Sequence, residues 1–260
     1  MTDAIWQPLF AELDRWSAAG RTVRLWLRDD DAIAPSPALT RLARLSETFD
    51  IAILLAVIPL LAQPALPREL RAMPRLLPCQ HGCRHKNHAP PGGKKSEFGR
   101  DRPDTIIRAD IAAARQRLDD LFGPARLPVF VPPWNRIDPA VAAALPALGF
   151  TGLSCFRDFT LGATGGPVLA NTHIDVMDWQ GGRIGRQAPE VITEICATLA
   201  ARRQDSTDDR LGVLLHHRDH DDTVWNFLDG VLRVIRDHRA IALTDPQDLF
   251  PPAETMATGS

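Results

Sequence analysis

The chain has 260 residues, of which 45% are hydrophobic, and this size suits one large core in a single domain over residues 1–260. Lysine and arginine total 30 against 32 acidic residues, so the chain lacks the basic excess that binding to nucleic acid demands. The longest apolar run, residues 51–61, is interrupted by Pro59 and is shorter than the roughly 18 residues that predict a membrane span.

The first twenty residues combine charged and apolar side chains, as an amphipathic helix does, and lack the uninterrupted apolar segment of a secretory signal. The four cysteines, at positions 79, 83, 155 and 196, are too few and too unevenly spaced for a disulfide scaffold. Both observations favour a cytoplasmic protein.

Short apolar runs alternate with longer amphipathic stretches along the chain. Helices are expected at residues 4–18, 37–48, 104–122, 139–148, 189–203 and 222–237, several with proline or aspartate in the first turn. Strands are expected at residues 22–27, 51–57, 127–131, 150–155, 211–215 and 240–243, with a weaker one at 75–79. Because the strands are continuously apolar, both faces of the sheet should be covered. The alternation predicts an α/β fold, a barrel-like arrangement of mostly parallel strands.

Most of the unusual polar clusters follow an expected strand. In a parallel α/β barrel, active sites are assembled at this end of the strands. The clusters lie at residues 28–31, 81–85, 132–136, 175 with 178–179, and 216–217, and the long Pro/Gly-rich loop at 88–102 has the character of a functional loop.

Three consecutive carboxylates, Asp29, Asp30 and Asp31, end the first expected strand. Their mutual repulsion is costly unless a cation offsets it, so the pattern favours a bound metal or an arginine partner. The alternative is that Asp30 or Asp31 caps the next helix, although Ser36 is better placed to do so.

His81 and His85 are four residues apart, so both imidazoles can reach a single ion. Two histidine nitrogens and one carboxylate leave a coordination position open for water, which is typical of a catalytic zinc site. Cys79 and Cys83 offer a structural zinc site as the alternative, but no second pair at ligand spacing follows them. A zincin peptidase is disfavoured because Gly82 stands where that motif needs glutamate.

The last cluster places His216 at the end of an apolar strand, where a histidine can act as a general acid near neutral pH. His217 takes this part instead if the strand ends one residue later.

Taken in order, these clusters resemble the five motifs of the polysaccharide deacetylases, the NodB-homology or carbohydrate esterase family 4 group. The resemblance spans residues 25–217. It implies that Asp30 is the catalytic base and that Asp31, His81 and His85 hold one divalent ion, expected to be Zn²⁺.

The third motif is matched at residues 131–134, where Trp134 would offer its backbone N–H to the developing oxyanion. The match departs from the family at Val131, because the family has an arginine there that pairs with the catalytic aspartate. We expect Arg136 to replace this cation, with Arg28 as the second candidate.

The fourth motif resembles residues 175–179, in which Asp178 and Trp179 are expected to contact substrate, with a buried core position for Trp179 as the nearly equal alternative. The fifth resembles Leu214-Leu215-His216 and implies that His216 is the general acid.

The resemblance implies a distorted (β/α) barrel that removes an N-acyl group, expected to be N-acetyl, from a sugar or glycan precursor. Two alternatives stay open. One is an amidase acting on a non-sugar N-acyl compound, and the other is a catalytically silent glycan-binding domain, which would explain the missing arginine.

Overall fold

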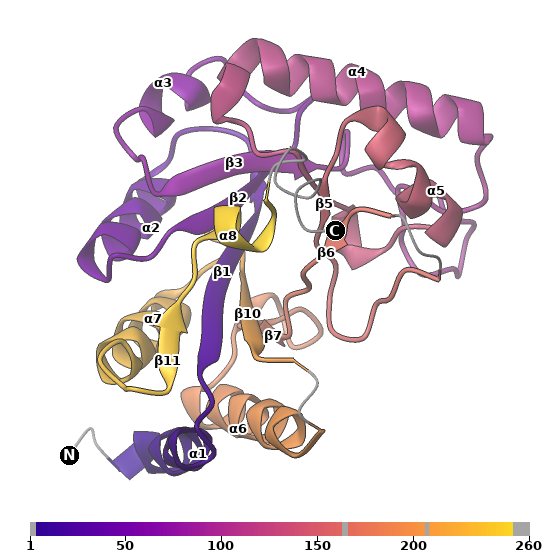
Figure 1. Ribbon diagram of the computed structural model, residues 1–260. Helices are drawn as coiled ribbons and strands as arrows, with labels where there is room; N and C mark the ends of the chain where they lie inside the picture. The colour runs from indigo at the N-terminus through magenta and orange to yellow at the C-terminus, as the bar shows by residue number, and fades with distance from the viewer. Residues whose placement is uncertain (1–3, 163–165, 206–207, 252–260) are drawn as a thin grey trace.

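A curved, mostly parallel sheet forms the centre of the computed structural model, which describes residues 4–162, 166–205 and 208–251 (Figure 1). The strands are β1 (Val23–Ala32), β2 (Ile53–Val57), β3 (Leu76–His81), β4 (Val129–Val131), β5 (Gly152–Leu153), β6 (Val168–Leu169), β7 (Ile174–Asp175), β8 (Met177–Asp178), β9 (Ile184–Gly185), β10 (Arg210–Leu215) and β11 (Ile241–Leu243). The order along the main sheet is β6-β5-β4-β3-β2-β1-β10-β7, with β11 also paired to β1. A separate hairpin joins β8 to β9 in antiparallel orientation.

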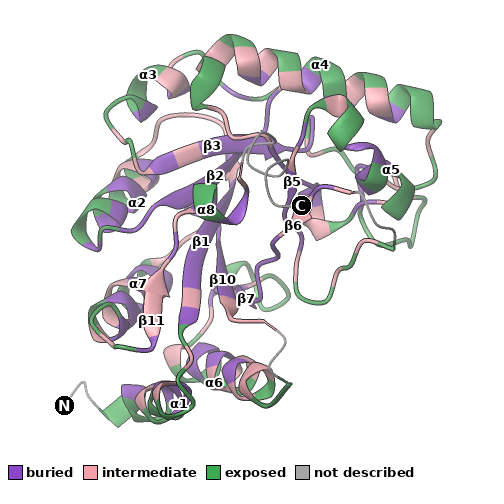
Figure 2. Ribbon diagram, in the orientation of Figure 1, coloured by how far each residue is buried: buried purple, intermediate pink, exposed green. Residues whose placement is uncertain are grey.

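Helices surround this sheet. They are α1 (Gln7–Ala18), α2 (Pro37–Thr48), α3 (Leu66–Leu70), α4 (Asp104–Phe122), α5 (Pro139–Ala144), α6 (Ala188–Asp205), α7 (Asp222–Ile235) and α8 (Pro246–Leu249). Figure 2 shows that the strands are largely buried, whereas the long helices bury one side and expose the other. The arrangement confirms the predicted mostly parallel α/β barrel, which is left open between its edge strands β6 and β7.

Helix α2 shows how the sequence sets these elements. The side chain of Ser36 accepts a hydrogen bond from the backbone N–H of Leu39, and Pro37 occupies the first turn, where its missing N–H costs nothing. Leu39, Leu42 and Leu45 follow at helical spacing and are buried. Burying each such side chain contributes roughly 1.5–3 kcal/mol.

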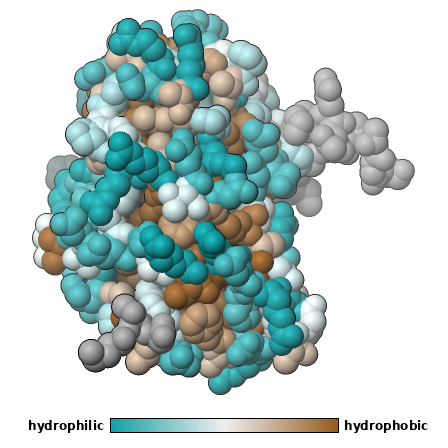
Figure 3. Space-filling model, turned by 90° about the vertical axis from the view of Figure 1, so that its left-hand side faces the viewer, coloured by the Kyte–Doolittle hydropathy of each residue, from teal (hydrophilic) through white to brown (hydrophobic). Residues whose placement is uncertain are grey.

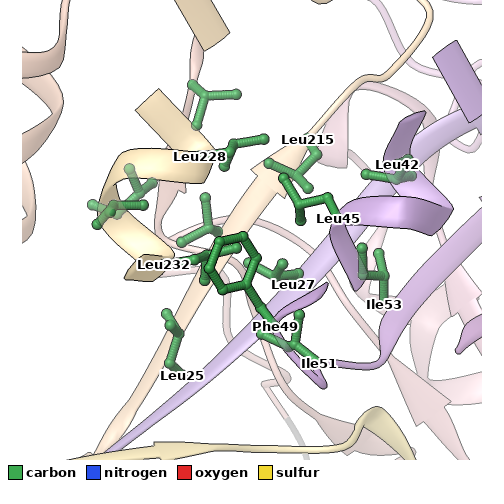
Figure 4. Close-up of a cluster of buried hydrophobic side chains, with 14 of the residues drawn as sticks. Leu25, Leu27, Leu42, Leu45, Phe49, Ile51, Ile53, Leu215, Leu228 and Leu232 are labelled. Carbon is green, nitrogen blue, oxygen red and sulfur yellow. The ribbon is translucent and has the colours of Figure 1, made fainter. Parts of the chain in front are cut away.

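The main core lies between β1 and the helices beside it. Figure 4 shows Leu25 and Leu27 of β1 among apolar side chains of α2, α7 and the neighbouring strands. On the face seen in Figure 3, hydrophilic residues surround a smaller hydrophobic area in the centre and below it. No helix among the described residues combines the length and apolar character needed to cross a membrane.

The end of β1 departs from this apolar pattern. Arg28, Asp29 and Asp30 are charged, yet each is at most 3% exposed. Buried charges are stable only when they are paired, so the end of this strand must supply their partners.

Candidate active site

A cleft of about 760 Å³ opens at the carboxyl ends of β1, β3, β4 and β10. All predicted site residues except Asp178 line it: Asp30, Asp31, His81, His85, Trp134, Arg136, Trp179 and His216. The sheet therefore brings together side chains that are up to 186 positions apart, counting from Asp30 to His216.

A bulge in β1 determines which way the side chains of Asp29, Asp30 and Asp31 point. Asp29 pairs with Leu55 and Ala32 with Val57, so β1 has one residue more than β2 in this interval. The backbone of Asp31 is left-handed, with φ of +72°. Successive side chains of a regular strand alternate between faces, and the extra residue interrupts that alternation. As a result Asp30 and Asp31, although adjacent, both face the cleft.

Asp31 lies between the two predicted histidines. Its Oδ1 is 3.2 Å from Nε2 of His81 and 3.4 Å from Nε2 of His85. One donor atom from each of the three residues lies within 4.8 Å of the others. The Nδ1 atom of His81 is 3.1 Å from the carbonyl oxygen of Val131 and donates to it, which leaves the lone pair of Nε2 directed at Asp31.

This arrangement suits a cation. Asp31 Oδ1 is buried and accepts no well-aligned hydrogen bond among the described residues. Two imidazole nitrogens and a carboxylate are the donors of catalytic zinc sites. The residues present therefore fit a divalent ion bound by Asp31, His81 and His85.

The charges of the three side chains are strongly coupled. Burial raises the pKa of Asp31, but the close imidazole of His81, together with the charge of His85, outweighs it and holds that pKa well below its usual range. Burial lowers the pKa of His81, yet the carboxylates of Asp30 and Asp31 raise it above its ordinary value. Burial also lowers the pKa of His85. Asp31 therefore stays ionised throughout the physiological pH range.

A tight turn carries His85 to the site. Gly82 and His85 both have left-handed backbones, with φ of +53° and +56°. The buried carboxylate of Glu97 accepts hydrogen bonds from the backbone N–H groups of Cys83 and Arg84, at 3.1 and 2.9 Å. A Cβ atom at Gly82 would lie 2.3 Å from Glu97 Oε2, so only glycine fits. Glu97 cannot be predicted from the sequence, because its 14-residue separation from Cys83 gives no local signal.

The structure distinguishes His216 from His217. His216 lines the cleft, and its ring lies 4.6 Å from that of Trp179. His217 points to the other side of the sheet, where its ring Nδ1 and its backbone N–H both contact the carboxylate of Asp29. His217 and Asp29 are at most 1% exposed, so this pair joins the ends of β10 and β1 and is closed to substrate.

The fourth motif supplies a wall of the cleft. Asp175 accepts hydrogen bonds from the indole Nε1 of Trp179, at 2.8 Å, and from the backbone N–H of Met177. Burial raises the pKa of Asp175. Asp178 does not line the cleft, and its carboxylate accepts hydrogen bonds from the backbone N–H groups of Gln180 and Gly181 within the β8–β9 turn.

Solved structures share this architecture. A putative polysaccharide deacetylase from Mycobacterium smegmatis superimposes with a TM-score of 0.59 at 14% identity, over 82% of this chain and 75% of its own. A peptidoglycan N-acetylglucosamine deacetylase superimposes with a TM-score of 0.56 at 13% identity, over 88% of both chains. The protein has the fold of the polysaccharide deacetylases. No protein-family profile and no curated protein sequence matches the chain.

The same fold also occurs without catalysis. A mutant of a pseudoenzyme of carbohydrate esterase family 4 superimposes with a TM-score of 0.53 at 12% identity, over 88% of this chain and 67% of its own. The polysaccharide deacetylase fold alone therefore does not determine whether a protein is active, and the side chains of the cleft decide it.

The expectation that Arg136 replaces the arginine of the third motif is wrong in its geometry. Arg136 is exposed and donates from Nη1 to the carbonyl oxygen of Lys95. Two left-handed residues, Trp134 and Asn135, precede it and redirect the chain.

The partner of Asp30 is Arg28. Its Nε and Nη2 atoms donate to the two carboxylate oxygens of Asp30 at 2.9 and 3.0 Å. The fully buried guanidinium also donates to Asn135 Oδ1, Ser154 Oγ and the carbonyl oxygen of Cys155. Residues two apart on a strand share a face, so Arg28 points toward Asp30 and away from Asp29. In this polysaccharide deacetylase fold, the cation beside the aspartate comes from β1.

The structure gives no support to a structural zinc site built from cysteines. Cys79 and Cys83 are buried in two different apolar clusters. Burial raises the pKa of both thiols well above the ordinary value, as is usual for cysteines packed among apolar side chains.

Proposed function

We propose that the protein is a divalent-metal-dependent hydrolase that removes an N-acetyl or related N-acyl group from a sugar or glycan precursor. The observation that carries the proposal is the unsatisfied, buried Oδ1 of Asp31, held between the Nε2 atoms of His81 and His85. Beside it in the same cleft are Asp30 and His216, which can accept and donate protons.

The proposed ion is Zn²⁺, because two imidazole nitrogens and one carboxylate match its preferred donors. When bound by Asp31, His81 and His85, such an ion lowers the pKa of water and polarises a carbonyl group. We propose both Zn²⁺ as the bound ion and a sugar or glycan precursor as the substrate.

The proposed roles of the other residues follow from their positions. Asp30, oriented by both guanidinium bonds from Arg28, accepts the proton of the attacking water. The backbone N–H of Trp134 donates to the oxygen that becomes negatively charged as the acyl carbon turns tetrahedral. His216 protonates the departing nitrogen, and Trp179 forms an apolar wall on which a sugar ring can stack.

The first prediction tests the metal site by elemental analysis of the purified protein. Wild type should contain about one divalent ion per chain, and His85→Ala should lose it, since two remaining donors hold zinc weakly. His88→Ala is the matched control, because His88 lies in the same loop but does not line the cleft. Metal retained in His85→Ala and lost in Cys83→Ser would refute the proposed site.

Activity is tested on the same preparations as acetate release from a panel of N-acetyl sugars and N-acyl amines. Release that depends on metal and is lost in Asp30→Asn supports the hydrolase. Release from the non-sugar amides alone would favour the amidase. A metal-loaded protein that binds glycans and releases no acetate would be a binding domain.

A further inference from the structure

The rim of the cleft is basic. Five cationic side chains line it together with the proposed catalytic residues: Arg84, Lys95, Arg136, Arg183 and Arg218. They come from three separate loops, which follow β3, β4 and β10, and from the β8–β9 hairpin. The chain as a whole carries a formal net charge of −2, so this concentration is local. All three lysines of the sequence, Lys86, Lys94 and Lys95, lie in the loop between β3 and α4.

Most of these rim cations have no acidic partner. Arg183 pairs with Asp219 at 2.9 Å. Among the described residues, no carboxylate lies within ion-pair distance of the other four. On the outer helices, in contrast, arginines such as Arg108 and Arg233 pair with aspartates one turn away.

Two rim arginines are held in place without losing their charge. Arg136 donates to the carbonyl oxygen of Lys95 at 2.9 Å, and Arg218 donates to that of Asp31 at 3.2 Å. Carbonyl oxygens orient a guanidinium but do not neutralise it. The bond from Arg136 also holds the loop that carries Lys95, so that two uncompensated cations lie on one side of the cleft.

The three aspartates that line the cleft do not pair with these rim cations. Asp175 accepts hydrogen bonds from Trp179 and Met177 and lies in no ion pair among the described residues. Asp30 is already paired with Arg28 inside the protein. Asp31 is the proposed ligand of a divalent ion, which more than offsets one carboxylate. The positive charge of the rim therefore exceeds the negative charge of the aspartates inside the cleft. The rim also faces solvent, where the remainder of a bound substrate would lie.

We propose that the substrate carries a phosphate or carboxylate group in addition to its N-acyl group, and that Lys95 and Arg136 bind this anion while Arg84 and Arg218 add to the positive field. This proposal rests on the hydrolase function proposed above and specifies its substrate class. Neutral glycans such as chitin-like chains have no group that would use these cations. A cleft lined by one sign of charge also concentrates ligands of the opposite sign.

The test compares pairs of compounds that differ only in an anion. N-acetylglucosamine is compared with its 1-phosphate, its 6-phosphate and its lactyl ether, N-acetylmuramic acid. The two phosphates test for a phosphate-binding site, and N-acetylmuramic acid tests for a carboxylate-binding site. At least one anionic compound should have a lower KM than the neutral sugar, and the difference should shrink as salt screens the charges.

The decisive variant is Lys95→Gln/Arg136→Gln. It should raise the KM of the preferred anionic compound roughly tenfold, the effect of losing two exposed ion pairs, while changing kcat much less. The matched control is Arg44→Gln/Arg71→Gln, which removes two exposed arginines that do not line the cleft. Equal KM values for neutral and anionic compounds, or an unchanged KM in the Lys95/Arg136 variant, would overturn the proposal and leave the hydrolase function standing.

A binding experiment makes the inference independent of turnover. Glucosamine 6-phosphate and glucosamine, which have no acyl group to lose, are titrated into metal-loaded protein by calorimetry. Tighter binding of the phosphate, lost in the Lys95/Arg136 variant, supports the anion site even if every acyl compound tested is inert. Equal binding of the two amines, with no change in the variant, refutes it.

Discussion

Arg28 has exchanged water entirely for protein partners, and its side chain is 0% exposed. Such a residue is stable only while its partners remain, because an isolated buried charge costs several kcal/mol. Its two bonds to Asp30 also fix the orientation of that carboxylate. A single residue thus links the stability of the barrel to the proposed base.

We predict that Arg28→Met lowers both stability and hydrolysis. The variant leaves Asp30 buried without its cation, at a cost of roughly 3–5 kcal/mol, which urea unfolding measures directly. Adding Val131→Arg, which restores an arginine at the third-motif position, should recover part of the rate. Full activity in Arg28→Met, or no rescue by an otherwise folded double variant, would show that the cation does not orient the base.

For individual residues, the sequence predicted that Asp31, His81 and His85 lie close together, but it did not predict the residues that hold them in place. Asp31, His81 and His85 come together as expected because each follows a strand of one parallel sheet. The pairing of Arg28 is hard to predict from the sequence, because it depends on which aspartate shares its strand face. Asn135, which accepts from Arg28, is 107 positions away and left no pattern to recognise.

At the scale of elements, the turn from Gly82 to His85 depends on Glu97, which lies outside the proposed metal site. The carboxylate of Glu97 accepts hydrogen bonds from two backbone N–H groups of this turn and so fixes its conformation from a position later in the same loop. The orientation of His85 toward Asp31 is therefore a property of the whole loop.

We predict that Glu97→Ala weakens metal binding roughly 10- to 100-fold, the usual effect of removing a residue that orients a ligand. Competition with a chelator measures the dissociation constant. Glu97→Gln should fall between, because its amide keeps one acceptor oxygen. Asp101→Ala is the control, an exposed carboxylate in the same loop. Wild-type affinity in Glu97→Ala would contradict the role assigned to Glu97.

Element prediction succeeded where the chain is long enough to show a period. Helices were expected at residues 37–48 and 104–122, the bounds that α2 and α4 have, because proline or aspartate marks their first turns. Strands β6, β7, β8 and β9 have two residues each, too few to show any alternation, and none was predicted. The expected strand at 22–27 proved longer, since β1 continues through its charged residues to Ala32.

At the scale of the whole molecule, the fold keeps two histidines neutral, the buried His173 and the half-buried His220. Nδ1 of His173 accepts the backbone N–H of Gly212, and Nε2 of His220 accepts that of His216. Burial lowers the pKa of His173 to about 3 and that of His220 to about 4. Protonation would remove both acceptors, so acid favours the unfolded chain.

We predict that His173 and His220 together lower the free energy of unfolding as the pH decreases from about 6.5 toward about 4. In this window the unfolded histidines bind protons that the folded ones do not, which costs about 1.4 kcal/mol per pH unit for each at most. Urea unfolding at pH 7 and pH 5 measures the difference. His173→Asn, whose amide oxygen can replace Nδ1, should show a smaller decrease, and an identical decrease would exclude His173 as a cause.

The bulge in β1 bears on how the motif can be transplanted or recognised. Asp30 and Asp31 reach the same cleft only because β1 has one residue more than β2 between Asp29 and Ala32. Grafted onto a regular strand of another scaffold, the same two letters would point to opposite faces, so the unit to be copied is the bulged pair of strands. Conversely, a sequence can predict such a bulge. Where two adjacent carboxylates at the end of a buried strand must share a site, the strand is expected to contain an extra residue there.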